Sequence, residues 1–146
     1  MTNKPRFVFD TSTLVSAVLF EQAKPSRAFR RALKLGQVLS SLSTLTELAE
    51  VLDREKFDRY VTKEEREEFL EGFIDRTLEM EPVEEIKACR DPSDDKFLAL
   101  AIDGEARCIV SSDKDLLVME TFRGIPIMTP AAFLDATEPE VDGEEA

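Results

Sequence analysis

Four acidic residues at separate points of the sequence are candidates for one metal site: Asp10, Glu47, Asp95 and Asp113. Carboxylates that lie a few ångströms apart raise one another's pKa, so a cluster of them favours a bound cation. Magnesium and manganese prefer oxygen ligands and keep coordination positions for water and phosphate oxygens. Such an ion can activate a water molecule and stabilise a departing oxygen. The four acids therefore predict metal-assisted hydrolysis of a phosphate ester, provided that the fold brings them together.

The residue types that are missing exclude other chemistries. The sequence contains no histidine, which excludes a Ser-His-Asp triad, a histidine acid/base pair and imidazole-ligated zinc. Its two cysteines are too few for a thiolate zinc site or a disulfide framework. Any catalysis must then depend on carboxylates, hydroxyls, lysines or a metal ion.

The net charge of −12 argues against a nucleic-acid partner, because contacts with phosphates draw on Lys and Arg. Two features weaken this argument. Five of the 31 acidic residues lie in residues 138–146, so residues 1–137 carry −7. Acids at a metal site would also be neutralised by the bound cation. The net charge therefore does not exclude RNA as a partner.

Strands and helices alternate along the sequence. Apolar and β-branched runs predict strands at residues 6–10, 37–40, 107–111 and 125–128. Apolar residues at helical spacing, with capping residues and stop signals, predict helices near residues 14–19, 26–35, 44–52, 62–82, 91–104 and from 129 onward. This alternation implies right-handed crossovers and an α/β fold with a parallel sheet covered on both faces. Pro126 places the last predicted strand at an edge of the sheet.

The length of 146 residues is sufficient for one domain, which we expect at residues 1–137. Residues 138–146 are acidic, lack apolar content and are predicted to be a disordered tail. No apolar run has the length of a membrane span, and the first residues do not have the pattern of a secretory signal. We therefore expect a cytoplasmic protein with no membrane partner.

The predicted topology gives the four acids a common location. Ligands of open parallel sheets bind outside the carboxyl ends of the strands. Asp10 and Asp113 follow two predicted strands. Glu47 lies near the start of one predicted helix, and Asp95 lies in the first turn of another. All four can therefore reach the same edge of the sheet.

Four segments, at residues 7–12, 44–48, 91–101 and 109–117, occur in the order seen in PIN-domain proteins. Over residues 6–134 the chain resembles the branch of this family formed by toxin components of toxin–antitoxin systems, related to VapC-type ribonucleases. The resemblance implies a PIN-like three-layer α/β/α sandwich with a central, mainly parallel β-sheet. It also implies an endoribonuclease that depends on Mg²⁺ or Mn²⁺ and that a small antitoxin protein holds inactive. A homodimer is a candidate assembly.

The resemblance also assigns roles to individual residues. The family's acidic metal-binding and catalytic positions are matched by Asp10, Glu47, Asp95 and Asp113. A strand-end hydroxyl, an auxiliary ligand and two supporting residues are matched by Ser111, Asp115, Thr11 and Asp94.

Two of the acids also have ordinary structural explanations. Asp10 is a good N-cap for the helix that follows it, although Thr11 and Ser12 offer hydroxyls for that task. Asp113 fits a turn, but its position directly after a predicted strand favours ligation.

The other two positions are more open. Glu47 also fits a capping box that begins at Thr44, and the residues alone leave the two interpretations even. Asp94 and Asp95 compete for one metal-binding position, and acids in a first helical turn are stabilised by the helix dipole in any case. The spacing to the apolar residues that follow favours Asp95 as the ligand and Asp94 as its capping neighbour.

Four basic residues recur on one face of the helix predicted at residues 26–35: Arg27, Arg30, Arg31 and Lys34. They are candidates for contacts with RNA phosphates or with an acidic partner. A solvated helix face is the more frequent explanation of such a pattern.

Two other functions remain open from the sequence. Residues 7–13 resemble the strand and nucleophile of a haloacid-dehalogenase-like phosphatase, with Asp10 as the nucleophile, but Ser12 replaces the second Asp expected there. The second alternative is a PIN-fold module that binds RNA or protein without catalysis. Intact acids at all four matching positions argue against it.

Overall fold

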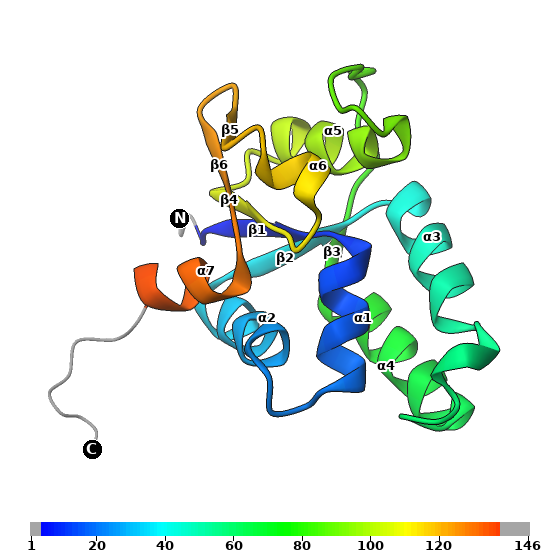
Figure 1. Ribbon diagram of the computed structural model, residues 1–146. Helices are drawn as coiled ribbons and strands as arrows, with labels where there is room; N and C mark the ends of the chain where they lie inside the picture. The colour runs from blue at the N-terminus through cyan, green and yellow to red at the C-terminus, as the bar shows by residue number, and fades with distance from the viewer. Residues whose placement is uncertain (1–3, 138–146) are drawn as a thin grey trace, which may run out of the picture.

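The computed structural model of the chain describes residues 4–137 (Figure 1). The tail predicted at residues 138–146 lies outside the described residues. The longest helix described has 14 residues, and within residues 4–137 none has the length and hydropathy that a membrane span requires.

A six-stranded sheet forms the middle layer, with the strand order β3-β2-β1-β4-β6-β5. The strands are β1 (Arg6–Phe9), β2 (Gln37–Ser40), β3 (Leu78–Glu79), β4 (Cys108–Val110), β5 (Thr121–Phe122) and β6 (Ile125–Met128). All neighbours are parallel except β5 and β6, which form an antiparallel hairpin. The predicted α/β fold with a mainly parallel sheet is therefore confirmed.

Helices cover both faces of this sheet. They are α1 (Thr11–Leu19), α2 (Lys24–Leu35), α3 (Leu42–Leu52), α4 (Lys63–Arg76), α5 (Asp95–Asp103), α6 (Lys114–Leu117) and α7 (Pro130–Ala136), with short 3-10 helices η1 (Glu55–Phe57) and η2 (Pro92–Asp94). In Figure 1, α5 and α6 lie above the sheet, α1, α2 and α7 lie below it, and α3 stands beside its right-hand end. This arrangement is the three-layer sandwich expected of the PIN fold.

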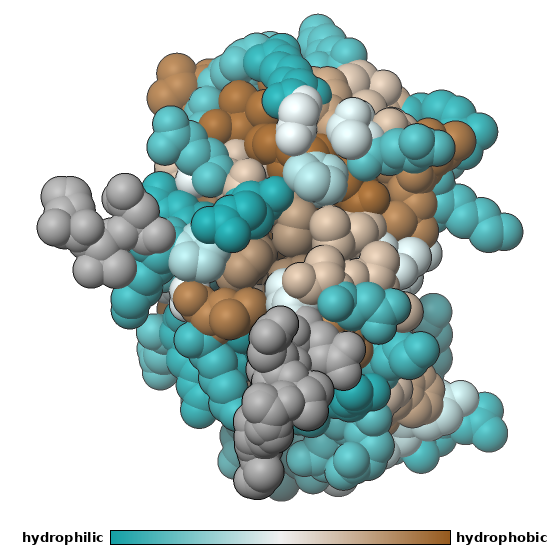
Figure 2. Space-filling model, turned by 90° about the vertical axis from the view of Figure 1, so that its left-hand side faces the viewer, coloured by the Kyte–Doolittle hydropathy of each residue, from teal (hydrophilic) through white to brown (hydrophobic). Residues whose placement is uncertain are grey.

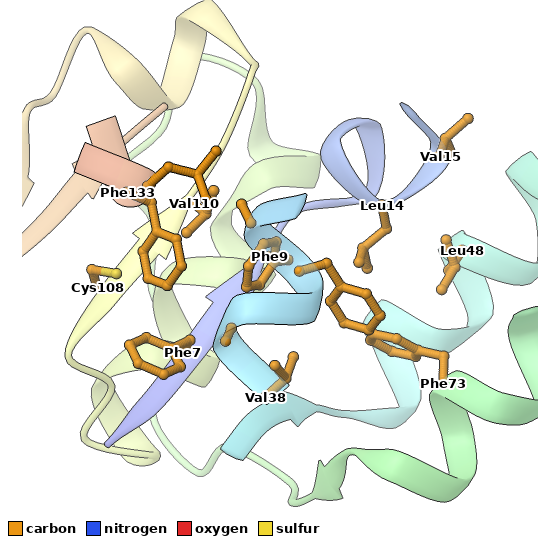
Figure 3. Packing of buried hydrophobic residues seen from close by; sticks show 14 of the residues in the cluster. Phe7, Phe9, Leu14, Val15, Val38, Leu48, Phe73, Cys108, Val110 and Phe133 are labelled. Carbon is orange, nitrogen blue, oxygen red and sulfur yellow. The ribbon is translucent and has the colours of Figure 1, made fainter. Parts of the chain in front are cut away.

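The central strand β1 sends alternate side chains into the two hydrophobic layers. Phe7 and Phe9 contact Phe133 edge to face, with ring centroids 5.3 and 6.1 Å apart, in the layer that contains α1, α2 and α7 (Figure 3). Val8 is fully buried in the opposite layer, together with apolar residues of α5. Because β1 is packed on both faces, the position of the residue that follows it is well defined.

Several element boundaries differ from the sequence predictions. The final strand, β6, is not an edge strand, because β5 pairs with it on the outer side. Pro126 is accommodated opposite Thr121 at the antiparallel β5–β6 pair. The helix predicted to end near Pro82 ends at Arg76, since the chain turns into the short parallel strand β3. The strands β3 and β5 have only two residues each, too few for a periodic signal.

Arg66 links α3 to α4 from a buried position. Its side chain is 2% exposed. The guanidinium donates to the carbonyls of Leu52 and Val61, both at 2.6 Å, and to Asp58 Oδ1 at 2.9 Å. These acceptors belong to the end of α3 and to the connection that follows it. Arg66 therefore holds the connection against α4.

Figure 2 views the molecule from the left-hand side of Figure 1, where the amino ends of the strands lie. Hydrophobic residues reach the surface there among hydrophilic ones. The carboxyl ends of β1 and β4, which carry the predicted acids, point to the opposite side, toward α3.

Candidate metal centre

Asp10 occupies the predicted position at the carboxyl end of β1. Its backbone N–H donates to the carbonyl of Val110 at 3.2 Å, which extends the pairing of β1 with β4. The side chain is buried and accepts a hydrogen bond from the Thr13 backbone N–H at 3.0 Å, so Asp10 is the N-cap of α1. Its other carboxylate oxygen accepts a hydrogen bond from Ser111 Oγ. One carboxylate oxygen of Asp10 therefore caps α1, and the hydrogen bond from Ser111 orients the other.

Ser111 connects the two acids that follow β1 and β4. Besides donating to Asp10, its hydroxyl oxygen accepts a hydrogen bond from the backbone N–H of Asp113 at 2.9 Å. Asp113 in turn caps α6, because its Oδ1 accepts from the Asp115 N–H at 2.9 Å. The structure therefore brings Asp10, Ser111 and Asp113 together, as the predicted topology requires. Thr11, another predicted supporting residue, is buried in the first turn of α1.

Burial makes the charge on Asp10 unfavourable. Desolvation is the main reason that the pKa of Asp10 is raised above its ordinary value. Hydrogen bonds from Ser111 and Thr13 lower that pKa in part, whereas the negative charge of Asp113 raises it further. A cation beside these carboxylates would relieve both the burial cost and the repulsion.

Asp94 is the third acid of this group. It lies at the end of η2, is only 6% exposed, and its Oδ2 is buried without a hydrogen-bond partner in the described part of the chain. Burial raises the pKa of Asp94 to about 7, with the proximity of Asp113 as the next cause and the charges of Asp91 and Asp10 as smaller ones. A buried carboxylate oxygen without a donor is costly, and a metal ion would satisfy it. The residues present therefore fit a divalent cation.

The described contacts favour Asp94 over Asp95 for the metal-binding position. The Asp95 carboxylate accepts hydrogen bonds from the backbone N–H groups of Ala88 at 3.1 Å and Cys89 at 2.8 Å. Although partial desolvation raises the pKa of Asp95, these backbone bonds outweigh it and lower the pKa overall. The spacing of the apolar residues favours Asp95 only where a regular α-helix runs through both residues. The 3-10 turn η2 ends at Asp94 instead, so Asp94 faces the other acids.

The structure also separates the two interpretations of Glu47. The capping box of α3 is formed by Ser41 and Thr44, so Glu47 is not needed for capping. Its carboxylate instead lies 2.8 Å from the ammonium of Lys96, which belongs to α5. Apart from this ionic contact, Glu47 Oε1 is buried without a hydrogen-bond partner within residues 4–137, as is Asp94 Oδ2.

A second group of acids adjoins the first through Asp94. Carboxylate oxygens of Asp91, Asp94 and Asp115 lie within 4.8 Å of one another and could hold a metal ion. Asp115, the predicted auxiliary ligand, is also paired with Arg90 at 2.8 Å. Asp91, which was not among the predicted site residues, also caps η2, because its Oδ1 accepts a hydrogen bond from the Ser93 N–H at 3.0 Å. The high density of acidic residues in residues 91–95 is the sequence signal that could have identified Asp91 as a site residue.

The basic residues of α2 have different surroundings. Arg31 donates to the carbonyl of Thr137 at 2.9 Å, just beyond the end of α7, and Arg30 bonds to Ser26 and to the carbonyl of Glu21. Arg31 therefore links α2 to the end of α7, and Arg30 holds local structure. The other two members of the predicted basic face, Arg27 and Lys34, are exposed.

The family follows from comparison with known proteins. The model of the PIN domain matches residues 6–115, more than half of the sequence, and the chain therefore belongs to the PIN domain family. A search of curated proteins finds no match.

Two solved structures have the same fold. One is VapBC2 from Rickettsia felis bound to a DNA fragment from its promoter, with a TM-score of 0.58, 13% identity, and coverage of 84% of this chain and 96% of that chain. The other is PAE2754 from Pyrobaculum aerophilum, with a TM-score of 0.59, 14% identity, and coverage of 90% and 89%. The resemblance to the PIN family and the predicted PIN-like fold are thus confirmed.

Proposed function

We propose that this PIN-domain protein is an endoribonuclease that requires Mg²⁺ or Mn²⁺ held by Asp10, Asp94 and Asp113. The observation that carries the proposal is the buried, unpartnered Oδ2 of Asp94 beside Asp113. A divalent ion at this position would supply an activated water and stabilise negative charge on the leaving oxygen. Among the four acids predicted from the sequence, Asp10 and Asp113 keep this role, and Asp94 takes the place of Asp95. Glu47 stays a candidate ligand, because its buried Oε1 has no hydrogen-bond partner within residues 4–137.

The surrounding residues prepare the carboxylates for this task. Ser111 donates to Asp10 and fixes the orientation of its oxygen. The backbone N–H of Asp113 donates to the same hydroxyl, so Ser111 links Asp10 to the turn that carries Asp113. Such outer contacts orient ligands and commonly change metal affinity or activity when they are removed. Asp91 and Asp115 would extend the site if a second ion binds.

Membership of the PIN domain family supports nuclease activity, and it supports RNA as the substrate. The similarity to a chain of VapBC2, a complex captured on promoter DNA, supports a small antitoxin protein as the partner. By this proposal the chain is the toxin of a toxin–antitoxin pair.

Cleavage of a mixed RNA pool tests the proposal. The unchanged full chain is incubated with the RNA and Mg²⁺ or Mn²⁺, and separately with a chelator. The Asp10→Asn variant is incubated with the RNA and the same metal ions. We expect fragments only for the unchanged chain with metal. Cleavage that persists in Asp10→Asn would exclude this mechanism, and the absence of cleavage on every RNA tested would favour the alternative of a binding module without catalysis.

A further inference from the structure

We propose that the surface formed by Phe20, Arg59 and Tyr60 binds single-stranded RNA, with a base stacked against the two aromatic rings and a phosphate bound by the arginine. We call it the aromatic–basic surface. It lies at the end of α1 that is remote from the metal centre. The inference rests on the proposed nuclease function, because it assigns a second contact for the same substrate.

Two large aromatic side chains lie side by side and exposed on this surface. Phe20, which follows α1, is 47% exposed, and Tyr60, in the connection between α3 and α4, is 54% exposed. Their ring centroids are 5.8 Å apart in an edge-to-face arrangement. Each other aromatic pair found within residues 4–137 contains a residue of the hydrophobic core. Exposed rings of this kind are platforms on which nucleic-acid bases stack, whatever their sequence.

Positive charge accompanies the rings, although the chain as a whole is acidic. The guanidinium of Arg59 lies 5.6 Å from the centre of the Tyr60 ring. Residues 53–63 contain four Lys or Arg and three acids, which gives a net charge of +1, whereas residues 1–137 carry −7. Aromatic rings combined with cations are typical of surfaces that bind single strands.

Ion pairing increases the charge that this surface can offer to RNA. The carboxylates of Asp53 and Asp58 are paired with Lys63 and Arg66. Three exposed cations of the same connection take no part in the ion pairs found within residues 4–137: Arg54, Lys56 and Arg59. They are therefore available to phosphates.

The buried Arg66 anchors the connection that carries Tyr60. Its guanidinium donates to Asp58 Oδ1 and to the carbonyl of Val61, so the chain is fixed on both sides of the tyrosine. The Tyr60 N–H also donates to the carbonyl of Phe57 at 3.0 Å, and the Phe57 ring is packed in the core. A residue that is already held in place loses less conformational entropy when a ligand binds.

Helix α1 connects the aromatic–basic surface to the metal centre. Asp10 caps the upper end of α1 in Figure 1, and Phe20 follows its lower end. At 1.5 Å per residue, the ten steps between these two residues correspond to about 15 Å. A single strand of several nucleotides can extend over this distance and contact both places. The aromatic–basic surface would then supply affinity for RNA where the acidic metal centre repels phosphates.

A protein is the other kind of partner that an exposed aromatic pair can indicate. Phosphates would neutralise the three unpaired cations and release counterions. Protein interfaces, in contrast, are depleted in lysine and in charge at their centre. The charge of this surface therefore favours RNA.

Tyr60 permits a direct test, because it is the only tyrosine of the chain. A fluorinated tyrosine labels this one position, so its fluorine NMR signal is assigned without variants. The labelled full chain is titrated in chelator, which prevents cleavage, with a short single-stranded RNA and with a strand of equal length that lacks bases. We expect the RNA to shift the signal and the strand without bases to shift it much less, because the ring current of a stacked base acts on the tyrosine.

Variants measure the contribution of each contact to RNA affinity in chelator, over a range of salt concentrations. They are Tyr60→Ala, Tyr60→Phe, Phe20→Ala and Arg59→Gln. Ile74→Ala and Arg76→Gln change exposed residues of α4 and serve as matched controls. Urea denaturation of each variant shows whether it remains folded.

We expect Tyr60→Ala and Phe20→Ala each to lower RNA affinity about tenfold, as for the loss of one stacking contact. Tyr60→Phe keeps the ring and should change affinity less than about twofold. Arg59→Gln should reduce the slope of log affinity against log salt by about 0.7, the value for one phosphate contact with a single strand. The control variants should match the unchanged chain.

Two results would overturn the inference. One is a fluorine signal that the RNA leaves in place, and the other is equal RNA affinity of Tyr60→Ala and the unchanged chain. Either result would leave a protein as the partner of the exposed rings. Absence of RNA cleavage by the unchanged chain with metal would instead contradict the proposed nuclease function alone, because binding in chelator is measured without catalysis.

Discussion

Two buried charged residues, Arg66 and Asp94, differ in how well their surroundings satisfy them. Arg66 is 2% exposed, and its guanidinium meets two backbone carbonyls and a carboxylate. Asp94 is 6% exposed, and one of its oxygens has no donor within residues 4–137. A buried charge whose hydrogen bonds the protein itself supplies is tolerated by the fold, whereas one that it leaves unsatisfied costs stability. The comparison indicates a structural role for Arg66 and supports the proposed ligand role of Asp94.

The surroundings of the two residues support this distinction. The partners of Arg66 all come from the segment that joins α3 to α4, so they are in place whenever the chain is folded. The charged neighbours of Asp94 are other acids, which raise its pKa. Only a ligand from outside the chain, such as a cation, can offset the repulsion between Asp94 and the neighbouring acids.

The largest expected effect is on folding, from Arg66→Met. Removal of the guanidinium leaves the carbonyls of Leu52 and Val61 without their donor in a buried place, and we expect a loss of about 3 kcal/mol in the free energy of unfolding. Urea denaturation measures it. Arg76→Met, at an exposed position of the same helix, serves as the control and should change stability by less than about 0.5 kcal/mol. Equal effects of the two substitutions would contradict the structural role of Arg66.

Asp94→Asn should act mainly on metal binding. Loss of the buried carboxylate removes a proposed ligand, and we expect Mn²⁺ affinity to fall about a hundredfold. Asp95→Asn is the matched control, since the neighbouring carboxylate bonds to the backbone of Ala88 and Cys89, and it should change affinity less than about threefold. Calorimetric titration with Mn²⁺ distinguishes the two, and a larger effect of Asp95→Asn would restore the assignment made from sequence spacing.

Ser111→Ala should have a smaller effect on the same site. The hydroxyl orients Asp10 and accepts from the Asp113 N–H, but it is not itself a proposed ligand. We expect the cleavage rate to fall about tenfold, the lower range for loss of an outer contact. Ser43→Ala, at an exposed position of α3, is a suitable control. An unchanged rate in Ser111→Ala would show that the strand ends hold the acids without this hydroxyl.

A dependence on pH that Asp94 causes is also expected. Burial raises the pKa of Asp94 from its ordinary value of 3.8 to about 7, so the folded chain keeps a proton there that the unfolded chain has lost. Stability of the metal-free protein should therefore decline as pH rises between these values, because the unfolded state binds fewer protons. Mn²⁺ competes with that proton, so its affinity should weaken about tenfold per pH unit below 7. Asp94→Asn should reduce both trends, and if it leaves them unchanged, other groups are responsible.

The sequence was sufficient to locate the acids that follow strands. Asp10 and Asp113 were placed correctly because the order of strands and helices implies parallel pairing, and the carboxyl ends of paired strands share an edge. The register of β1 with β4 sets Phe9 opposite Val110, so Asp10 and Ser111 come next on neighbouring strands. The alternation of side chains that makes these strands recognisable is a local property of the chain.

Only the tertiary structure shows which of Asp94 and Asp95 lies near the other acids, and which residue Glu47 contacts. The first depends on a 3-10 turn before α5, which rotates adjacent side chains to different sides. The second depends on the packing of α3 near α5, which brings Lys96 to a residue 49 positions earlier in the sequence. Local spacing carries no information about such contacts, because they arise only when separate elements pack together.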